Sequence, residues 1–184
     1  MRALGRFRLI SPALAALALA YLLVMVVLGA QPKQRQLVKF EAKGVLRIEP
    51  GSVRRVTLSR DGRQAQLVRN AEGGWTLERG GAVEAAVATH LETAVKMLHR
   101  SAPVREIAPE ELAGVDTRPF GLQEAPLLAA LSGPGGPVLS VRFGAHNPEG
   151  FLQYMAIEGD PKVYLMSRFV GAEWLAALDG MEVR

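Results

Sequence analysis

The sequence predicts an α+β protein, in which an N-terminal transmembrane helix is followed by a mostly antiparallel β domain with two main helices. Residues 9–28 contain no charged side chain. Beyond residue 43, short segments that alternate apolar and polar residues are separated by turn residues such as Gly, Pro and Asp, which is typical of hairpins. In this part only residues 83–99 and 170–178 place apolar side chains at helical spacing. Strands in hairpins with few, separate helices indicate the α+β class.

Residues 9–28 are long enough to cross a membrane as a helix, because a rise of about 1.5 Å per residue takes them across a hydrocarbon core of roughly 30 Å. A cleaved signal usually has a shorter apolar region of about 7–15 residues. Cleavage after Ala30 would also put Leu28 where a small residue is preferred. A buried helix of a soluble protein would keep a polar side. We therefore expect an uncleaved anchor.

The anchor divides the chain into four regions: a basic cytoplasmic tail (1–8), the transmembrane helix (9–28), a polar linker (31–43) and an extracytoplasmic domain (44–184). Lys and Arg flank the helix on both sides, so the positive-inside rule does not decide the orientation. The short basic start is typical of a signal sequence. It favours the N-terminus inside and the domain outside.

The first half of the domain predicts strands joined by turns. In four segments apolar residues occupy alternate positions, which places them on one face of a strand. These segments are residues 44–49, 52–59, 64–69 and 74–79. Asp61 and Gly62, between the second and third segments, form a dipeptide preferred in two-residue hairpin loops.

Residues 83–99 predict an amphipathic helix. Glu92 and Lys96 lie opposite its apolar face, His99 and Arg100 suit the negative end of the helix dipole, and Pro103 prevents continuation. The apolar face consists of Val83, Val87, Leu91, Ala94, Val95 and Leu98.

The second half begins with a short strand at residues 104–107 and a helical turn at 109–112, which a proline can start. Four further strands are predicted from alternation and turn residues. They are residues 126–131, 138–143, 151–157 and 163–166. A last helix over residues 170–178 ends at Gly180. Each half thus resembles four strands followed by a helix, which hints at a duplication, although the two sequences do not match.

Composition restricts the partners. Three of the 22 Lys and Arg residues precede the anchor, leaving 19 against 18 Asp and Glu, so the rest of the chain is nearly neutral. Nucleic-acid binding requires a concentrated basic surface, and we expect no nucleic-acid partner. The chain has no cysteine, which excludes disulfides and thiolate metal sites.

The three histidines do not predict a site. His90 and His99 are nine residues apart on one helix, so at about 100° per residue they lie on opposite faces and cannot share a metal ion. His146 falls in a predicted turn over residues 144–150, where a single histidine is usually solvated. We expect no catalytic, cofactor-binding or metal-binding residue and no cofactor.

Other motifs lack the spacing that chemistry requires. Glu110 and Glu111 are adjacent and do not converge on one point. Glu110 is expected to cap the turn at 109–112 or to place its charge at the start of that turn. The run at 133–137 (GPGGP) fits neither phosphate-binding pattern and predicts a hairpin loop. No Gly-x-Ser-x-Gly and no Ser-x-x-Lys motif occurs. Trp75 and Trp174 are expected to pack in the core.

Several short motifs, in this order, resemble the DUF4340 domain family. The most specific is residues 120–126 (FGLQEAP), which is similar to the family's Tyr-Gly-Leu-x-x-Pro signature, with Phe120 in place of the tyrosine and one extra residue before Pro126. The other matching pieces are VLRIE (45–49), GGWTL (73–77), REI (105–107), RFG (142–144), Gly150, Tyr154 and VYLM (163–166).

The resemblance covers about residues 45–184 and implies a small α+β domain behind an anchor in a bacterial inner membrane, on the periplasmic or extracytoplasmic side. Members often accompany ABC-type transport systems. The family has no established catalytic residue to carry over. Its matching glycines fit fold maintenance, and Gly121 is expected to adopt a backbone conformation that other residues avoid.

These observations predict a single-pass envelope protein, not an enzyme, whose outer domain binds another protein. It would be an accessory or scaffold subunit of a membrane complex such as a transporter. Its tether to the lipid bilayer would raise the effective concentration of a weak binding surface. A lipid- or glycolipid-handling module is the alternative, which copurifying lipid would reveal. An enzyme is the third possibility, but the sequence offers no nucleophile–base pair.

Overall fold

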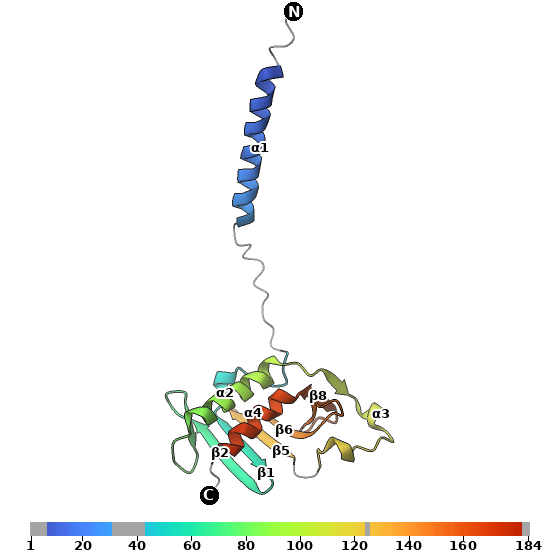
Figure 1. Ribbon diagram of the computed structural model, residues 1–184. Helices are drawn as coiled ribbons and strands as arrows, with labels where there is room; N and C mark the ends of the chain where they lie inside the picture. Colours follow the sequence, from blue (N-terminus) through green and yellow to red (C-terminus); the bar gives the residue numbers. More distant parts are fainter. Residues whose placement is uncertain (1–6, 31–42, 124–125, 182–184) are drawn as a thin grey trace, which may run out of the picture. The chain divides into compact units, whose positions relative to one another are not determined.

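The computed structural model describes residues 7–30, 43–123 and 126–181, which belong to two compact units divided after Phe40. The first unit contains helix α1 (Phe7–Ala30), which includes the predicted helix over residues 9–28 (Figure 1). Large apolar side chains along it, among them Leu17 and Val26, are exposed. The predicted tail up to residue 6 and the predicted linker up to residue 42 lie outside the described residues.

In the part of the chain that the structure describes, no helix is both long enough and apolar enough to span a membrane.

The second unit is an α+β domain built on one eight-stranded sheet with the order β3-β2-β1-β5-β6-β7-β8-β4. All neighbouring strands are antiparallel, which confirms the predicted class. The strands are β1 (Arg55–Arg60), β2 (Arg63–Arg69), β3 (Trp75–Leu77), β4 (Arg105–Ile107), β5 (Leu127–Gly133), β6 (Gly136–His146), β7 (Leu152–Ile157) and β8 (Val163–Ser167). The helices are α2 (Ala85–Arg100), the single turn α3 (Pro109–Leu112) and α4 (Arg168–Asp179), with 3₁₀ turns η2 (Pro50–Ser52) and η3 (Arg118–Phe120).

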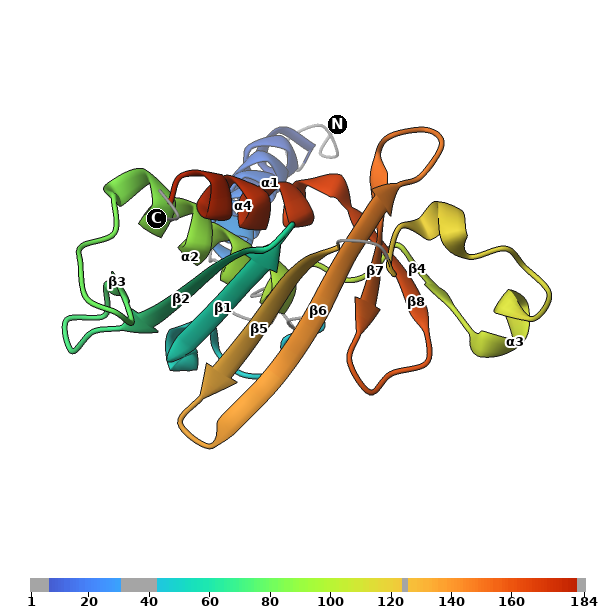
Figure 2. The same ribbon diagram turned by 90° about the horizontal axis from the view of Figure 1, so that it is seen from below.

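Helices α2 and α4 lie on the same face of the sheet (Figures 1 and 2). The predicted apolar stripe of α2 supplies one side of the core, because Val87, Leu91, Ala94, Val95 and Leu98 are all buried. Trp75 and Trp174 are also buried, as predicted. Nδ1 of His90 on α2 lies 2.7 Å from Oε2 of Glu173 on α4 and joins the two helices at their surface.

The predicted strand over residues 44–49 is wrong. Its backbone amides donate instead to the end of α2: Gly44 N to His99 O and Leu46 N to Leu98 O, both at 3.0 Å. The last carbonyls of a helix have no partner within the helix, and this segment satisfies two of them. Leu46 is still buried. The alternating pattern therefore predicted the burial of Leu46 correctly, but not the secondary structure of the segment. The first half therefore has three paired strands, and the proposed duplication loses its main support.

Two turns form as predicted. Asp61 and Gly62 join β1 to β2 with φ values of 51° and 76°, the left-handed pair that a two-residue hairpin requires. Gly133 pairs with Gly136, so GPGGP is a hairpin loop between β5 and β6. Glu110 lies in the first turn of α3, where its charge was expected, but the capping hydrogen bond is made by Glu111. The Oε1 of Glu111 accepts a hydrogen bond of 3.0 Å from the backbone N of Ala108.

A smaller apolar cluster lies on the other face of the sheet, at the β7-β8-β4 end. It contains Ile107, Ala156 and Val163 from these strands and Leu122 from the segment that follows η3. Neighbouring strand residues such as Met155 and Tyr164 belong to the main core, since successive side chains point to opposite faces. The chain between β4 and β5 thus covers this end of the sheet.

Gly121→Val is expected to lower the free energy of unfolding by roughly 1–3 kcal/mol. Gly121 has φ 63° and ψ 22°, a left-handed conformation that strains a β-branched residue. A Cβ there would also lie 2.9 Å from the backbone N of Ala145. Urea unfolding followed by circular dichroism measures the change.

Gly51→Val is the matched control, because Gly51 has no positive φ and a Cβ added to it would meet no atom within 4 Å. Its unfolding free energy should change by less than about 0.5 kcal/mol. Equal effects of the two substitutions would contradict the backbone argument.

Candidate functional site: a pocket between helix α4 and the sheet

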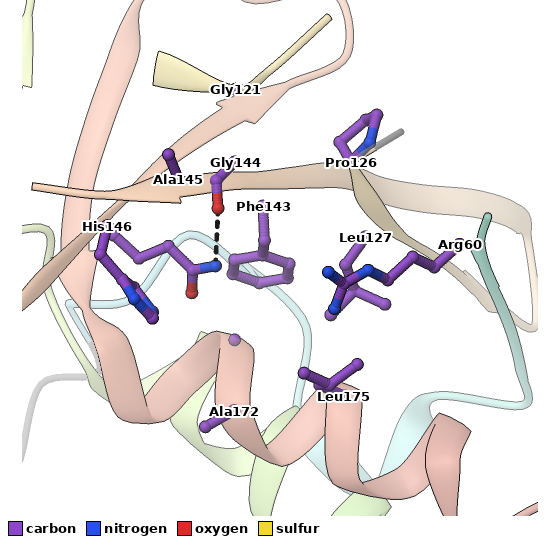
Figure 3. Close-up of a pocket in the computed structure, with 12 residues that line it drawn as sticks. Arg60, Gly121, Pro126, Leu127, Phe143, Gly144, Ala145, His146, Ala172 and Leu175 are labelled. Carbon is purple, nitrogen blue, oxygen red and sulfur yellow. Dashed lines mark hydrogen bonds between the residues drawn. The ribbon is translucent and has the colours of Figure 1, made fainter. Parts of the chain in front are cut away.

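A pocket of about 460 Å³ opens between helix α4 and the ends of several strands (Figure 3). Pockets that bind small molecules typically measure about 300–1,000 Å³. Gly171, Ala172 and Leu175 of α4 line one side, and residues of β1, β5, β6 and β7 line the other. The apolar side chains in its wall are Pro126, Leu127, Phe143, Ala145, Ala172 and Leu175.

A bulge in β6 shapes the pocket. The pairing of β6 with β7 shifts register between Phe143 and His146. Gly144 lies at this irregularity and lets the backbone of Phe120 approach closely, because a Cβ on Gly144 would collide with the Phe120 carbonyl oxygen. Two of the motifs quoted for the family resemblance, residues 120–122 and 142–144, therefore contact each other directly. Their packing fixes the wall of the pocket.

Gln153 of β7 crosses the pocket towards α4. Its Nε2 donates a hydrogen bond of 2.9 Å to the carbonyl oxygen of Gly144 (Figure 3). Its Oε1 is buried and has no hydrogen-bond partner in the described part of the chain. Gly171 allows this arrangement, since a Cβ on Gly171 would overlap that oxygen. The absence of a side chain at Gly171 thus lets the amide of Gln153 pack directly against the backbone of helix α4.

The polar ends of the pocket differ from its apolar middle. Figure 3 shows Arg60 and His146 at opposite ends, with Phe143, Leu127 and Leu175 between them. The Arg60 Nε lies 3.2 Å from Oδ2 of Asp61, and 40% of the Arg60 side chain is exposed. Of the lining residues in the described part of the chain, none is acidic and none carries a hydroxyl, thiol or amine side chain. The described lining offers apolar side chains together with one guanidinium, one imidazole and one amide, which are groups that can contact or hydrogen-bond a ligand.

The structure separates the three histidines. His90 pairs with Glu173, and Nδ1 of His99 lies 3.1 Å from the carbonyl oxygen of Leu46. The predicted turn around His146 is wrong at its start, because β6 continues to His146 and places it in the pocket. Among the described residues, no group of three or more His, Asp or Glu side chains could hold a metal ion.

Sequence reasoning missed Arg60, Gln153 and Gly171 as site residues. Each comes from a different element, and no local spacing connects them. The one signal in the sequence was Gly171, because a glycine inside a helix pattern is unfavourable and commonly has a packing reason.

A second polar cluster lies half-buried between β2 and α2. Arg69 on β2 lies 2.6 Å from Oε1 of Glu92 on α2, and its guanidinium stacks on Trp75 at 4.3 Å from the ring centroid. The indole N–H of Trp75 donates to the same carboxylate oxygen at 2.9 Å. Arg69 Nε donates to Val53 O at 3.0 Å. These contacts connect the sheet to α2, and Nη2 of Arg69 is buried without a hydrogen-bond partner in the described part of the chain.

An exposed aromatic patch adjoins the His146 end of the pocket. It consists of Phe151, Arg168 and Phe169, and the two phenylalanines are 71% and 59% exposed. The Arg168 backbone N donates to Phe151 O at 3.1 Å, and the Arg168 guanidinium lies 5.3 Å from the centroid of the Phe169 ring. Asn147, the residue after His146, accepts a hydrogen bond of 3.1 Å from the Phe151 backbone N. The patch and the pocket are therefore neighbours.

Comparisons of the chain with protein-family models, curated proteins and solved structures found no match. The resemblance to the DUF4340 domain family stays a prediction that rests on the motifs themselves.

Proposed function

We propose that this chain is a single-pass envelope protein whose domain binds another protein and acts as an accessory or scaffold subunit of a membrane complex, such as a transporter. The observation that carries the proposal is the aromatic patch. Aromatic residues and arginine are enriched at the centres of protein interfaces and dominate their binding energy. Two exposed phenylalanines with an arginine between them are such a group.

The anchor in this proposal rests on the uncharged sequence of residues 9–28, only part of whose side chains belong to the described part of helix α1. Its leucines, valines and tyrosine between residues 14 and 26 have exposed fractions of 54–71%. A helix with such side chains all round is stable where a nonpolar environment covers them, and a bilayer provides it. The basic start and the resemblance favour a bacterial inner membrane with the domain on the periplasmic or extracytoplasmic side. Tethering then raises the effective concentration of the patch at a partner in the same membrane.

Protein recovered from membranes is expected to retain the anchor. Its intact mass should correspond to all 184 residues. A mass that corresponds to a chain beginning at Gln31 would show a cleaved signal and contradict the anchor.

Interface mutagenesis tests the patch. In the full chain, Phe151→Ser with Phe169→Ser should lower recovery of the native membrane complex at least tenfold, because interface aromatics of this kind contribute about 2 kcal/mol or more. Val138→Ser is the control, because Val138 is also an exposed apolar residue but lies far from the patch. It is on β6, eight residues before His146, which separates the two residues by roughly 26 Å along the strand. The control substitution should leave recovery unchanged.

A photoreactive phenylalanine analogue at position 169 adds a direct readout. It should form an adduct with one protein partner in native membranes, whereas the same analogue at position 138 should not. Equal adducts from both positions, or adducts with lipid alone, would contradict protein binding at the patch.

A lipid- or glycolipid-handling module is the second candidate function. The pocket favours it, because its wall is mainly apolar and it has the size of a ligand site. Lipid that copurifies with the domain in a fixed ratio, and that Ala172→Phe displaces from the pocket, would support this function.

A further inference from the structure

We propose that the pocket between α4 and the sheet binds a free aliphatic carboxylate of medium chain length, with the carboxylate at Arg60 and the chain along Leu127, Phe143 and Leu175. This inference goes beyond protein binding at the aromatic patch and does not depend on it.

The walls of the pocket select an aliphatic chain. Leu127 from β5, Phe143 from β6 and Leu175 from α4 face one another across it (Figure 3). If a methylene group takes about as much room as a water molecule, roughly 30 Å³, a pocket of about 460 Å³ has room for about fifteen such groups, which is enough for a carboxylate, a chain on the order of ten carbons and a water molecule. A lipid with two long chains would not fit inside it. The volume therefore favours a single-chain ligand.

The charge of the lining selects an anion. Among the lining residues that the structure describes, Arg60 carries the fixed charge and none is Asp or Glu. Figure 3 shows the Arg60 guanidinium turned towards Leu127 and Leu175. Its Nε is near Asp61, a surface pair that solvent screens. Within the described residues neither Nη atom has a hydrogen-bond partner, so one N–H of each Nη can donate to a carboxylate in a bidentate pair.

The far end of the pocket accommodates a polar or small terminus. There the buried Oε1 of Gln153 lacks a partner in the described part of the chain, and the side chain itself is held by Gly144. A buried acceptor is unfavourable without a donor. A bound chain that stops before Gln153 leaves room for a water molecule to donate to it.

Photolabelling tests the proposal on the full chain in lipid nanodiscs. The probe is a ten-carbon fatty acid with a diazirine near its methyl end, and the matched probe is the alcohol of the same length. Labelled sites are located by peptide mass spectrometry and normalised to label on the nanodisc scaffold protein. We expect the acid to label peptides that contain residues 126–146 and 168–179, and the alcohol to label them at least fivefold less.

Substitutions separate charge from shape. Arg60→Gln should lower labelling by the acid at least fivefold, whereas Arg60→Lys should retain most of the labelling. Arg54→Gln is the control and should leave labelling unchanged, because Arg54 is exposed and lies just before the start of β1, whereas Arg60 lies at the end of that strand. Ala172→Phe should lower labelling by both probes, since Ala172 is exposed at the pocket and a larger side chain can fill it. A thermal melt of each variant confirms that it folds.

Equal labelling by acid and alcohol, or undiminished labelling of Arg60→Gln, would overturn the proposal. Labelling that avoids both pocket peptides would also overturn it. Adduct formation at position 169 with a protein partner is measured separately, so failure of the pocket and failure of the patch are distinguishable.

Discussion

Trp174→Ala is expected to lower the free energy of unfolding by about 3–5 kcal/mol, which is at the upper end for a single core substitution. Trp174 on α4 is fully buried and is the largest such side chain in the described part of the chain. Its removal takes away apolar burial and leaves a cavity between α4, α2 and the sheet. Urea unfolding of the protein, followed by circular dichroism, measures the loss.

Trp174→Phe is the matched variant and should cost less than half as much. The indole Nε1 is buried and has no hydrogen-bond partner among the described residues. Replacing the indole by a phenyl ring removes this unsatisfied donor and keeps most of the apolar volume. If phenylalanine and alanine were equally destabilising, the N–H group would have to make a bond that matters to stability.

Glu92→Ala is expected to lower the free energy of unfolding by about 2–4 kcal/mol. The Arg69 side chain is 7% exposed and the Glu92 side chain 31% exposed. Without the carboxylate, the Arg69 guanidinium stays largely buried with its charge uncompensated, and Trp75 loses the acceptor of its indole N–H. The partial exposure of Glu92 places the effect below that of a fully buried pair.

A double-mutant cycle isolates the interaction. Arg69→Met together with Glu92→Leu should be less destabilising than Glu92→Ala alone, because no buried charge remains. Glu78→Ala is the control, since Glu78 pairs with the exposed Arg55 on the same sheet and surface pairs contribute about 0–1 kcal/mol. A loss on Glu92→Ala no larger than that on Glu78→Ala would contradict the structural role of the Arg69 cluster.

Local signals in the sequence determined most of the elements. The dipeptide Asp61-Gly62 specified a hairpin because a two-residue loop requires positive φ at both positions. The spacing of apolar residues identified five of the six side chains predicted for the buried face of α2, while Val83 lies before the helix begins and is partly buried. Such a pattern depends only on the geometry of one helix or strand and on which of its sides faces the core. It can therefore be recognised without knowing which other elements pack against that side.

The same patterns do not predict which backbone groups hydrogen-bond to each other. Leu46 is buried as its alternation predicts, yet the backbone around it bonds to the end of α2, because alternation reports burial and not the hydrogen-bond partner. The pairing of β1 with β5 joins residues about seventy positions apart, and no local signal encodes it.

The candidate site depended entirely on such long-range packing. The sequence by itself determined the α+β class, the uncharged N-terminal helix segment, two hairpin turns and the two buried tryptophans. Only the tertiary structure brought Arg60, Gln153 and Gly171 around one pocket and moved His146 from a predicted turn to the end of β6. The physical reason is that periodicity arises from the geometry of one element, whereas a pocket is the space that several elements leave when their side chains pack.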